Sequence, residues 1–501
     1  MPSILFLPDL LAALPAKILG LSVYQLYQFY DFLWPAILFI LIFLIANQLI
    51  KNKTGALLLS SWIMLVNCFF DFNRPISPQF VFIFALSFIF LLLLVLIKDK
   101  PIYGYLAGIN FGLLFYIYLY YWTYLGALLG LMFLYFIFVK NYSYARKIFS
   151  VGLVGFMVGI PYFILLWVKG GDIDYQDLTP RVGLIHTRFP SSLEMMIWAA
   201  VFLAIFVLFW FFKKNNLRQL SKIEVLLFCG VSSIIVSNCQ QVITGINLLF
   251  TVHYKMISYF FILFSLIYLI FQNKKAVSWL KSNLVKFIII MIILVGFISQ
   301  LVRVSTFDYL PEINSQRYGA IYDWLNANGG QKCVVMSDQD YALNELVPAY
   351  TNCDELFAGN GNFYNISAAE VLDRFVVNNY RVKNFDADYI KKNYEYIFGI
   401  HDNVLAGNLH QRNMIYKIFD WPQVNEDEIR FSREKIDQVI NLMDDMDQAE
   451  WLNRLKQYQV RYLVYDSTVD GNWLPLVDIN KFGVFKKVFS ANNIDIYQIE
   501  I

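Results

Sequence analysis

The sequence is short of charged residues. They make up 16% of its 501 residues, whereas a soluble domain carries roughly 25%. Hydrophobic residues make up 58%, so the composition excludes an ordinary soluble protein and predicts an integral membrane protein. The formal net charge is only +2. A basic field that would attract nucleic acid is therefore missing, and no nucleic-acid partner is expected.

Cysteine is scarce as well. Five cysteines in a chain of this length exclude a dense disulfide framework. Cys333 and Cys353 both lie in the C-terminal region and can pair if that region is outside the cell, although their spacing alone does not establish a bond. The same region has no zinc-ligand spacing, no Gly-rich phosphate loop and no nucleophile elbow.

Long apolar runs fill residues 31–303. A helix needs about 20 apolar residues to cross a hydrocarbon core. We therefore predict about ten transmembrane helices in a polytopic helical domain, at residues 31–50, 56–70, 80–97, 105–120, 123–139, 148–168, 193–212, 223–239, 256–272 and 285–303. In residues 1–30 proline interrupts the apolar positions, which predicts interfacial helices of an external loop.

Lysine and arginine are distributed unevenly between the connectors. Every second connector between the predicted spans belongs to a set that is richer in lysine and arginine. The positive-inside rule predicts that this set is cytoplasmic. That set contains Lys51, Lys53, Lys98, Lys100, Lys140, Arg146, Lys147, Lys213, Lys214, Arg218, Lys222, Lys274, Lys275 and Lys281. The loops at 71–79, 169–192 and 240–255 are then external. The rule predicts a multi-pass protein of the plasma membrane with its C-terminal region outside.

The same rule bears on the N-terminus. Ten spans and an external C-terminus require an external N-terminus, yet no signal peptide precedes it. Either one span is miscounted or the chain as given begins within the first external loop of a longer protein, with a first helix upstream of Met1; we favour the second interpretation.

Residues 304–501 have ordinary charge density and no apolar run long enough to span a membrane. Alternating β-like and helical patterns predict a soluble extracytoplasmic α/β domain. Strands are expected at 333–336, 461–467 and 494–501, and helices at 367–377 and 430–458. Ser367 and Glu370 have the spacing of a capping box. Asp447 precedes a helical pattern, so we interpret Asp445-Met446-Asp447 as a cap rather than as a nucleotide-sugar motif.

The short external loops contain few polar groups. Asp71 and Arg74 lie in a proline-rich turn, where a guanidinium can hold a phosphate through two hydrogen bonds. The alternative is an arginine that reaches lipid headgroups. Tyr120 to Tyr124 form a short aromatic connection, which is typical of the belt at a membrane surface.

The loop at 169–189 is the longest connector. Asp172 and Asp174, with Asp177 nearby, can supply oxygen ligands to a divalent cation, Mg²⁺ or Mn²⁺. Arg181, His186 and Arg188 can face an anionic substrate. The alternative is a solvated loop without a ligand.

The segment 237–255 is the most polar interruption between apolar runs. It contains Gln240, Gln241 and His253, which can bind hydroxyl or phosphate groups, and the histidine can also act as a base. An ordinary loop between two helices is the alternative.

Several of these segments resemble bacterial members of the GT-C class of membrane glycosyltransferases. The resemblance rests on RPISP at 74–78, YYWTYLGALLG at 120–130, NCQQVITG at 238–245 with His253-Tyr254, YDWLNANGGQKCVVMS at 322–337, YQVRYLVYD at 458–466 and IDIYQIEI at 494–501. It implies the transfer of a sugar from a polyprenyl-phosphate carrier to a glycan, lipid or protein acceptor on the external face of the cell envelope. The bound phosphate would contact Arg74, Arg181, Arg188 and His253.

One departure from that class is evident. Its acidic catalytic residue lies in the first external loop, which here would fall upstream of Met1, so no catalytic residue is assigned within the chain. A non-catalytic transporter or scaffold for envelope polysaccharide or lipid is the alternative. A transporter should have polar or broken helices at mid-membrane depth, whereas the polar groups here gather on one predicted side.

Overall fold

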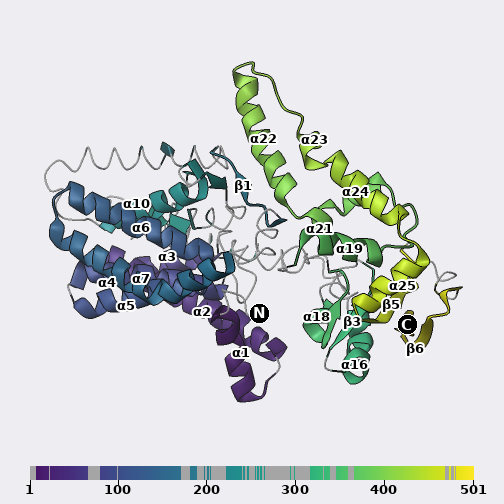
Figure 1. The fold of residues 1–501 in the computed structure, drawn as a ribbon. Helices are drawn as coiled ribbons and strands as arrows, with labels where there is room; N and C mark the ends of the chain where they lie inside the picture. The colour runs from purple at the N-terminus through teal and green to yellow at the C-terminus, as the bar shows by residue number, and fades with distance from the viewer. Residues whose placement is uncertain are drawn as a thin grey trace. The chain divides into compact units, whose positions relative to one another are not determined.

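A computed structural model describes most of the chain (Figure 1). The described residues are 7–21, 23–65, 79–98, 100–170, 181–188, 222–239, 241–242, 245–247, 316–330, 332–338, 346–358, 366–468, 473–474, 479 and 481–500, together with 197, 200, 201, 204, 254, 257, 258, 260, 261, 264, 265, 291, 294 and 298.

The chain forms two compact units, each described separately below. The first unit comprises Met1–Lys169, Thr187–Ile246 and Phe250–Thr306, and the second comprises Gly170–His186, Asn247–Leu249 and Phe307–Ile501. The external loop predicted between residues 169 and 192 is thus divided, and most of it belongs to the same unit as the C-terminal region. The sequence gives no sign of this division.

The first unit is a bundle of helices (Figure 1). Its described elements are α1 (Leu7–Leu19), α2 (Val23–Ile50), α3 (Lys53–Leu65), α4 (Val81–Lys98), α5 (Pro101–Leu114), α6 (Leu119–Phe138), α7 (Tyr142–Gly170), α10 (Lys222–Ile234) and the π-helical turn η3 (Ile235–Cys239). Helix α2 continues without a break from the region predicted as interfacial into the first predicted span.

Four helices among the described residues are long and apolar enough to cross a membrane. They are Phe32–Ile50, Val81–Lys98, Leu119–Phe138 and Tyr142–Val168. The prediction of membrane-spanning helices is therefore supported, but the number ten is not. Helices α3, α5 and α10 are shorter than a bilayer requires, and most residues of the segments predicted at 193–212, 256–272 and 285–303 lie outside the described part of the chain.

Helices α5 and α7 approach each other at glycines. Gly108 and Gly112 on α5, and Gly155 and Gly159 on α7, are each spaced by four residues, so that each pair lies on one helix face. A Cβ added to Gly108 would lie 2.6 Å from the Val154 Cβ and 2.9 Å from the Val151 carbonyl oxygen. Only glycine permits this backbone contact.

The second unit is built on a five-stranded mixed sheet with strand order β4-β3-β5-β7-β6. The strands are β3 (Cys333–Met336), β4 (Cys353–Glu355), β5 (Val460–Asp466), β6 (Phe485–Ala491) and β7 (Ile494–Ile499). β4, β3 and β5 are parallel, whereas β7 pairs antiparallel with β5 and β6. Two further short strands are β1 (Ile185–His186) and β2 (Ile246–Asn247).

Helices cover both faces of the sheet. Side chains alternate along a strand, so Ile494 and Ile496 of β7 pack on one face with Leu325, while Tyr497 packs on the other with Trp451. The helical elements of this unit are η4 (Gln316–Tyr318), α16 (Gly319–Asn328), α18 (Leu346–Tyr350), α19 (Ala368–Asn378), α20 (Ala387–Lys392), α21 (Tyr394–Phe398), α22 (His401–Ile418), α23 (Glu426–Arg430), α24 (Arg433–Asp444) and α25 (Gln448–Gln457).

A disulfide joins Cys333 to Cys353, two directly paired positions on the neighbouring strands β3 and β4. The pairing that the sequence left open is thus present. It fastens the edge strand β4, which is only three residues long, to its neighbour β3.

The predicted elements of this unit are largely found. The three predicted strands correspond to β3, β5 and β7, while the short β4 and the exposed β6 were missed. The predicted helix 430–458 is two helices, because Asp447 accepts a hydrogen bond from the backbone N–H of Glu450 and begins α25. At α19, the Ser367 Oγ accepts the N–H of Glu370 at 3.1 Å, as its spacing predicts.

Candidate functional site

Two polar segments predicted to face a substrate meet in the first unit. Gln241 and Gly245 are joined in a turn, in which the Gly245 N–H donates to the Gln241 carbonyl at 2.8 Å. Gly245 has a φ of +75°, which glycine adopts without strain. The Gly245 carbonyl then accepts the N–H of Thr187 at 3.0 Å. The end of the long loop therefore lies against the turn at 241–245.

Arg188 lies at this junction. Its Nη1 donates to the Val242 carbonyl at 2.8 Å, and its side chain is exposed. A Cβ on Gly245 would lie 3.7 Å from the Arg188 Nη2, so the guanidinium passes directly over the glycine. A guanidinium that is exposed and oriented by a backbone carbonyl suits the recognition of a phosphate.

Gln241 lies beneath the same turn. Its side chain is buried, while its backbone carbonyl closes the turn at Gly245. This placement suits a residue that shapes the loop. Direct contact of its amide with a sugar stays a prediction.

Arg181 and His186 belong to the second unit. Arg181 is 4% exposed, its guanidinium donates to the Ile366 carbonyl, and its own carbonyl accepts the N–H of Ile400 at 2.9 Å. These contacts anchor the loop within the second unit. His186 is exposed in β1, which lies against α22.

The other predicted site residues lie outside the described part of the chain. These are Asp71, Arg74, Asp172, Asp174, Gln240 and His253. The described residues contain no cluster of three or more groups suited to a metal ion. Because both aspartates proposed as ligands lie outside the described residues, the divalent cation stays a prediction.

The tyrosines at 120–124 differ from the expected aromatic belt. Tyr121 and Tyr124 are buried inside the first unit, and Thr123 shares a hydrogen bond of 2.7 Å with the Tyr254 hydroxyl. Another hydrogen bond of 2.7 Å joins Ser233 to Ser258. Sequence reasoning missed these contacts, because the hydroxyls are separated by 131 and 25 residues along the chain.

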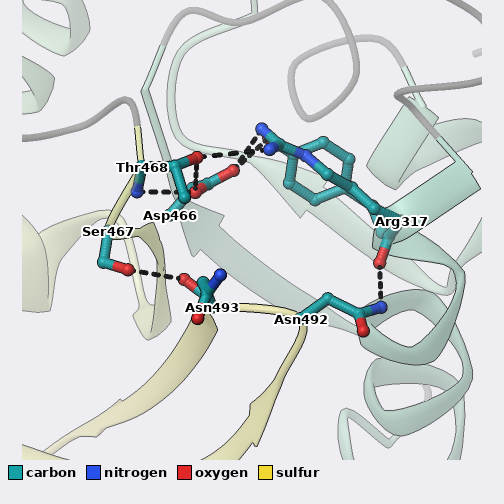
Figure 2. A network of polar contacts seen from close by, with 7 residues as sticks. Arg317, Asp466, Ser467, Thr468, Asn492 and Asn493 are labelled. Carbon is teal, nitrogen blue, oxygen red and sulfur yellow. Dashed lines mark hydrogen bonds and ion pairs between the residues drawn. The ribbon is translucent and has the colours of Figure 1, made fainter.

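In the second unit, two acidic residues lie at or near the carboxyl ends of parallel strands, where α/β proteins often bind ligands. Asp466 ends β5 and is fully engaged (Figure 2). It forms an ion pair with Arg317, accepts the Tyr318 hydroxyl at 2.8 Å and accepts the Thr468 N–H at 2.9 Å. This network joins the start of α16 to the sheet and is structural.

Glu355, at the end of β4, is different. Its carboxyl accepts the Ser337 hydroxyl at 3.1 Å, but its second oxygen is buried without a hydrogen-bond partner among the described residues. Burial raises the pKa of the Glu355 carboxyl well above its usual value, and the hydrogen bond from Ser337 opposes that only in part. A cavity of about 300 Å³ adjoins it, lined also by Phe357 and Arg374.

Comparison with known proteins adds no family. A scan against protein-family models finds no match, and a search of curated proteins finds no relative.

Proposed function

We propose that the protein is a membrane glycosyltransferase of the GT-C class, which moves a sugar from a polyprenyl-phosphate carrier to an acceptor on the external face. The observation that supports it most directly is the junction of two predicted external loops at Arg188, whose guanidinium is exposed and held by the Val242 carbonyl.

The external location has independent support. The disulfide between Cys333 and Cys353 belongs to a unit with ordinary surface charge. Disulfides persist in oxidising compartments and are rare in the cytosol. An extracytoplasmic second unit agrees with the lysine and arginine distribution, which places the loops at 169–192 and 240–255 on the same side.

In the proposed reaction, an acceptor hydroxyl attacks the anomeric carbon and the bond to the carrier phosphate breaks. The departing polyprenyl phosphate gains negative charge, which the Arg188 guanidinium stabilises through charge-assisted hydrogen bonds. Gln241 and Gly245 keep the turn in place beneath it. The base that takes the acceptor proton is not assigned to a described residue.

The first test is binding of polyprenyl phosphate by the full chain in nanodiscs. We expect Arg188→Ala to weaken binding about tenfold, since a charge-assisted hydrogen bond contributes about 1.5 kcal/mol. Arg188→Lys should restore part of the affinity. Arg146→Ala is the matched control, because Arg146 is exposed at the start of α7 in a connector predicted to be cytoplasmic.

The second test is turnover. Membranes that charge their lipid carriers with radiolabelled sugars supply the donor, and release of polyprenyl phosphate is measured. Equal binding and turnover in wild type and Arg188→Ala would remove Arg188 from the site. If the wild type consumes no carrier-linked sugar but moves the intact lipid-linked sugar across vesicles, the transporter replaces the enzyme.

A further inference from the structure

Helices α22 and α23 form a hairpin (Figure 1), and exposed apolar side chains gather where the chain turns between them. We call Met414, Ile418, Phe419, Trp421 and Val424 the apolar tip. Ile418 is 76% exposed, Phe419 61% and Trp421 55%. Large apolar side chains exposed together on a soluble domain usually mark an interaction surface.

The apolar tip is held in a fixed shape. The Trp421 N–H donates back to the Tyr416 carbonyl at 2.8 Å, and Asp420 between them has a φ of +56°. This is the Schellman arrangement that ends a helix. The Phe419 and Trp421 rings stack, with their centroids 5.3 Å apart. The exposure is therefore a property of an ordered turn.

The returning segment is also fastened to α22. The Asn413 side-chain amide donates to the Val424 carbonyl at 2.8 Å and accepts the Val424 N–H at 3.1 Å. One turn farther along the hairpin, the His410 Nδ1 lies 3.1 Å from the Glu426 Oε1. Both sides of the turn are thus fixed before any partner binds, which reduces the entropy lost on binding.

The chain itself indicates the partner. Its described residues include four helices suited to a bilayer, and the second unit is covalently connected to them. The apolar tip combines Trp, Phe and Ile with Lys417 beside them. Aromatic rings and the long stem of lysine are favoured where hydrocarbon meets headgroups.

We propose that the apolar tip inserts into the headgroup region of the bilayer that holds the protein's own transmembrane helices. Insertion removes the exposed rings from water and gives the second unit a contact with the membrane besides its covalent connections. The inference does not depend on the glycosyltransferase proposal, since a transporter or scaffold would carry the same hairpin.

The test places a fluorophore on the tip of the full chain in nanodiscs. Cys68, Cys229 and Cys239 are replaced by Ala, and bimane is attached at Phe419→Cys. The matched control is Leu442→Cys, which is 40% exposed on α24 of the same unit. Lipids brominated at two depths should quench the fluorophore at 419 several-fold more than at 442, at a depth of about 5 to 10 Å.

A second variant distinguishes insertion of the apolar tip into lipid from burial of the tip by another protein or a second copy. With the label at Val424→Cys, the double change Ile418→Asp and Phe419→Asp should abolish the lipid quenching and leave the thermal unfolding of the second unit unchanged. The proposal is overturned if lipid quenching is equal at 419 and 442. It is overturned as well if the label at 419 is shielded from water but not quenched by lipid, because a protein or a second copy would then cover the tip.

Discussion

The two units bury the same kinds of side chain but differ in what surrounds them. Helices of the first unit also expose apolar side chains on the outside, as Leu134, Phe138 and Phe149 show. The second unit surrounds its sheet with helices that carry ion pairs on their surface, such as that between Glu370 and Arg374 within α19. The former surface suits a bilayer and the latter suits water, so the outer surface distinguishes the units more than the core does.

Polar groups are satisfied differently as well. In the first unit, the hydroxyls of Ser60 and Ser258 donate to carbonyls four residues earlier in the chain. A buried hydroxyl among apolar helices finds an acceptor within its own helix in this way, and Ser258 adds a hydrogen bond with Ser233. In the second unit, Ser367 and Ser432 cap helix starts. The same residue type thus avoids unpaired groups in one unit and defines helix ends in the other.

The largest effect is expected where the first unit packs most closely. A Cβ at Gly112 would lie 2.8 Å from the Gly155 carbonyl oxygen and collide with Val158. Gly112→Ala should therefore destabilise the bundle by about 3 kcal/mol. Gly130→Ala is the control, since nothing lies within 4 Å of its added Cβ. Thermal unfolding of the full chain in nanodiscs measures both, and equal melting temperatures would contradict the close packing.

Removing the disulfide should weaken the second unit alone. The bond closes a loop with a sequence separation of 20 residues, so replacing both Cys333 and Cys353 by Ala should cost about 3 kcal/mol. Hydrogen exchange should accelerate in β3 and β4 but not in α4 or α6. Adding a reductant to the variant should change nothing further, and faster exchange across both units would show that they unfold together.

Lowering the pH should reduce the stability of the second unit through Asp402, which lies in the first turn of α22. Burial alone would raise the pKa of Asp402, but hydrogen bonds from His401, Lys435 and Tyr394 outweigh it and lower the pKa to about 2. A lowered carboxyl pKa stabilises the fold above the usual value of 3.8 and loses that contribution as pH falls toward 2.

Asp402→Asn should lower the free energy of unfolding by about 2 kcal/mol already at neutral pH, because it removes the charge that accepts these hydrogen bonds. Unfolding followed between pH 6 and about 2.5 should show a steeper decline for the wild type than for the variant. Parallel declines would remove Asp402 as the cause.

The smallest expected effect is an increase in the stability of the second unit when Glu355 is replaced. Because the Glu355 pKa is raised, its folded form favours the proton, and stability is full below the usual value of 4.5 but falls as pH rises. Glu355→Gln should stabilise the second unit by on the order of 1 kcal/mol at neutral pH and by nothing in acid. Glu434→Gln, at an exposed position of α24, should have no effect at either pH. A destabilised Glu355→Gln at neutral pH would mean that the carboxylate is required.

Local sequence patterns predicted secondary structure correctly where residues close together in the sequence determine it. The run at Cys333–Met336 is a strand, and the caps at Ser367 and Asp447 begin helices. These features need only neighbours within a few residues. The three-residue strand β4 was missed, because it is stabilised by β3 and a disulfide rather than by its own pattern.

The candidate site was predicted less completely. The sequence selected Arg188 for an anionic substrate and Gln241 for hydroxyl or phosphate groups, and it expected both side chains to face a ligand. The structure exposes Arg188 and buries Gln241. It also engages Arg181 with Ile366, 185 residues away. Exposure depends on what packs against a side chain, and no local pattern contains that information.

The sequence by itself determined that apolar helices and a charged α/β unit share this chain, because hydrophobic composition and periodicity decide which solvent each segment meets. Only the tertiary structure decided that the long loop is divided between the units, that α5 and α7 meet at glycines, and that Cys333 pairs with Cys353. Each depends on contacts between residues distant in sequence, which form only when the chain has folded.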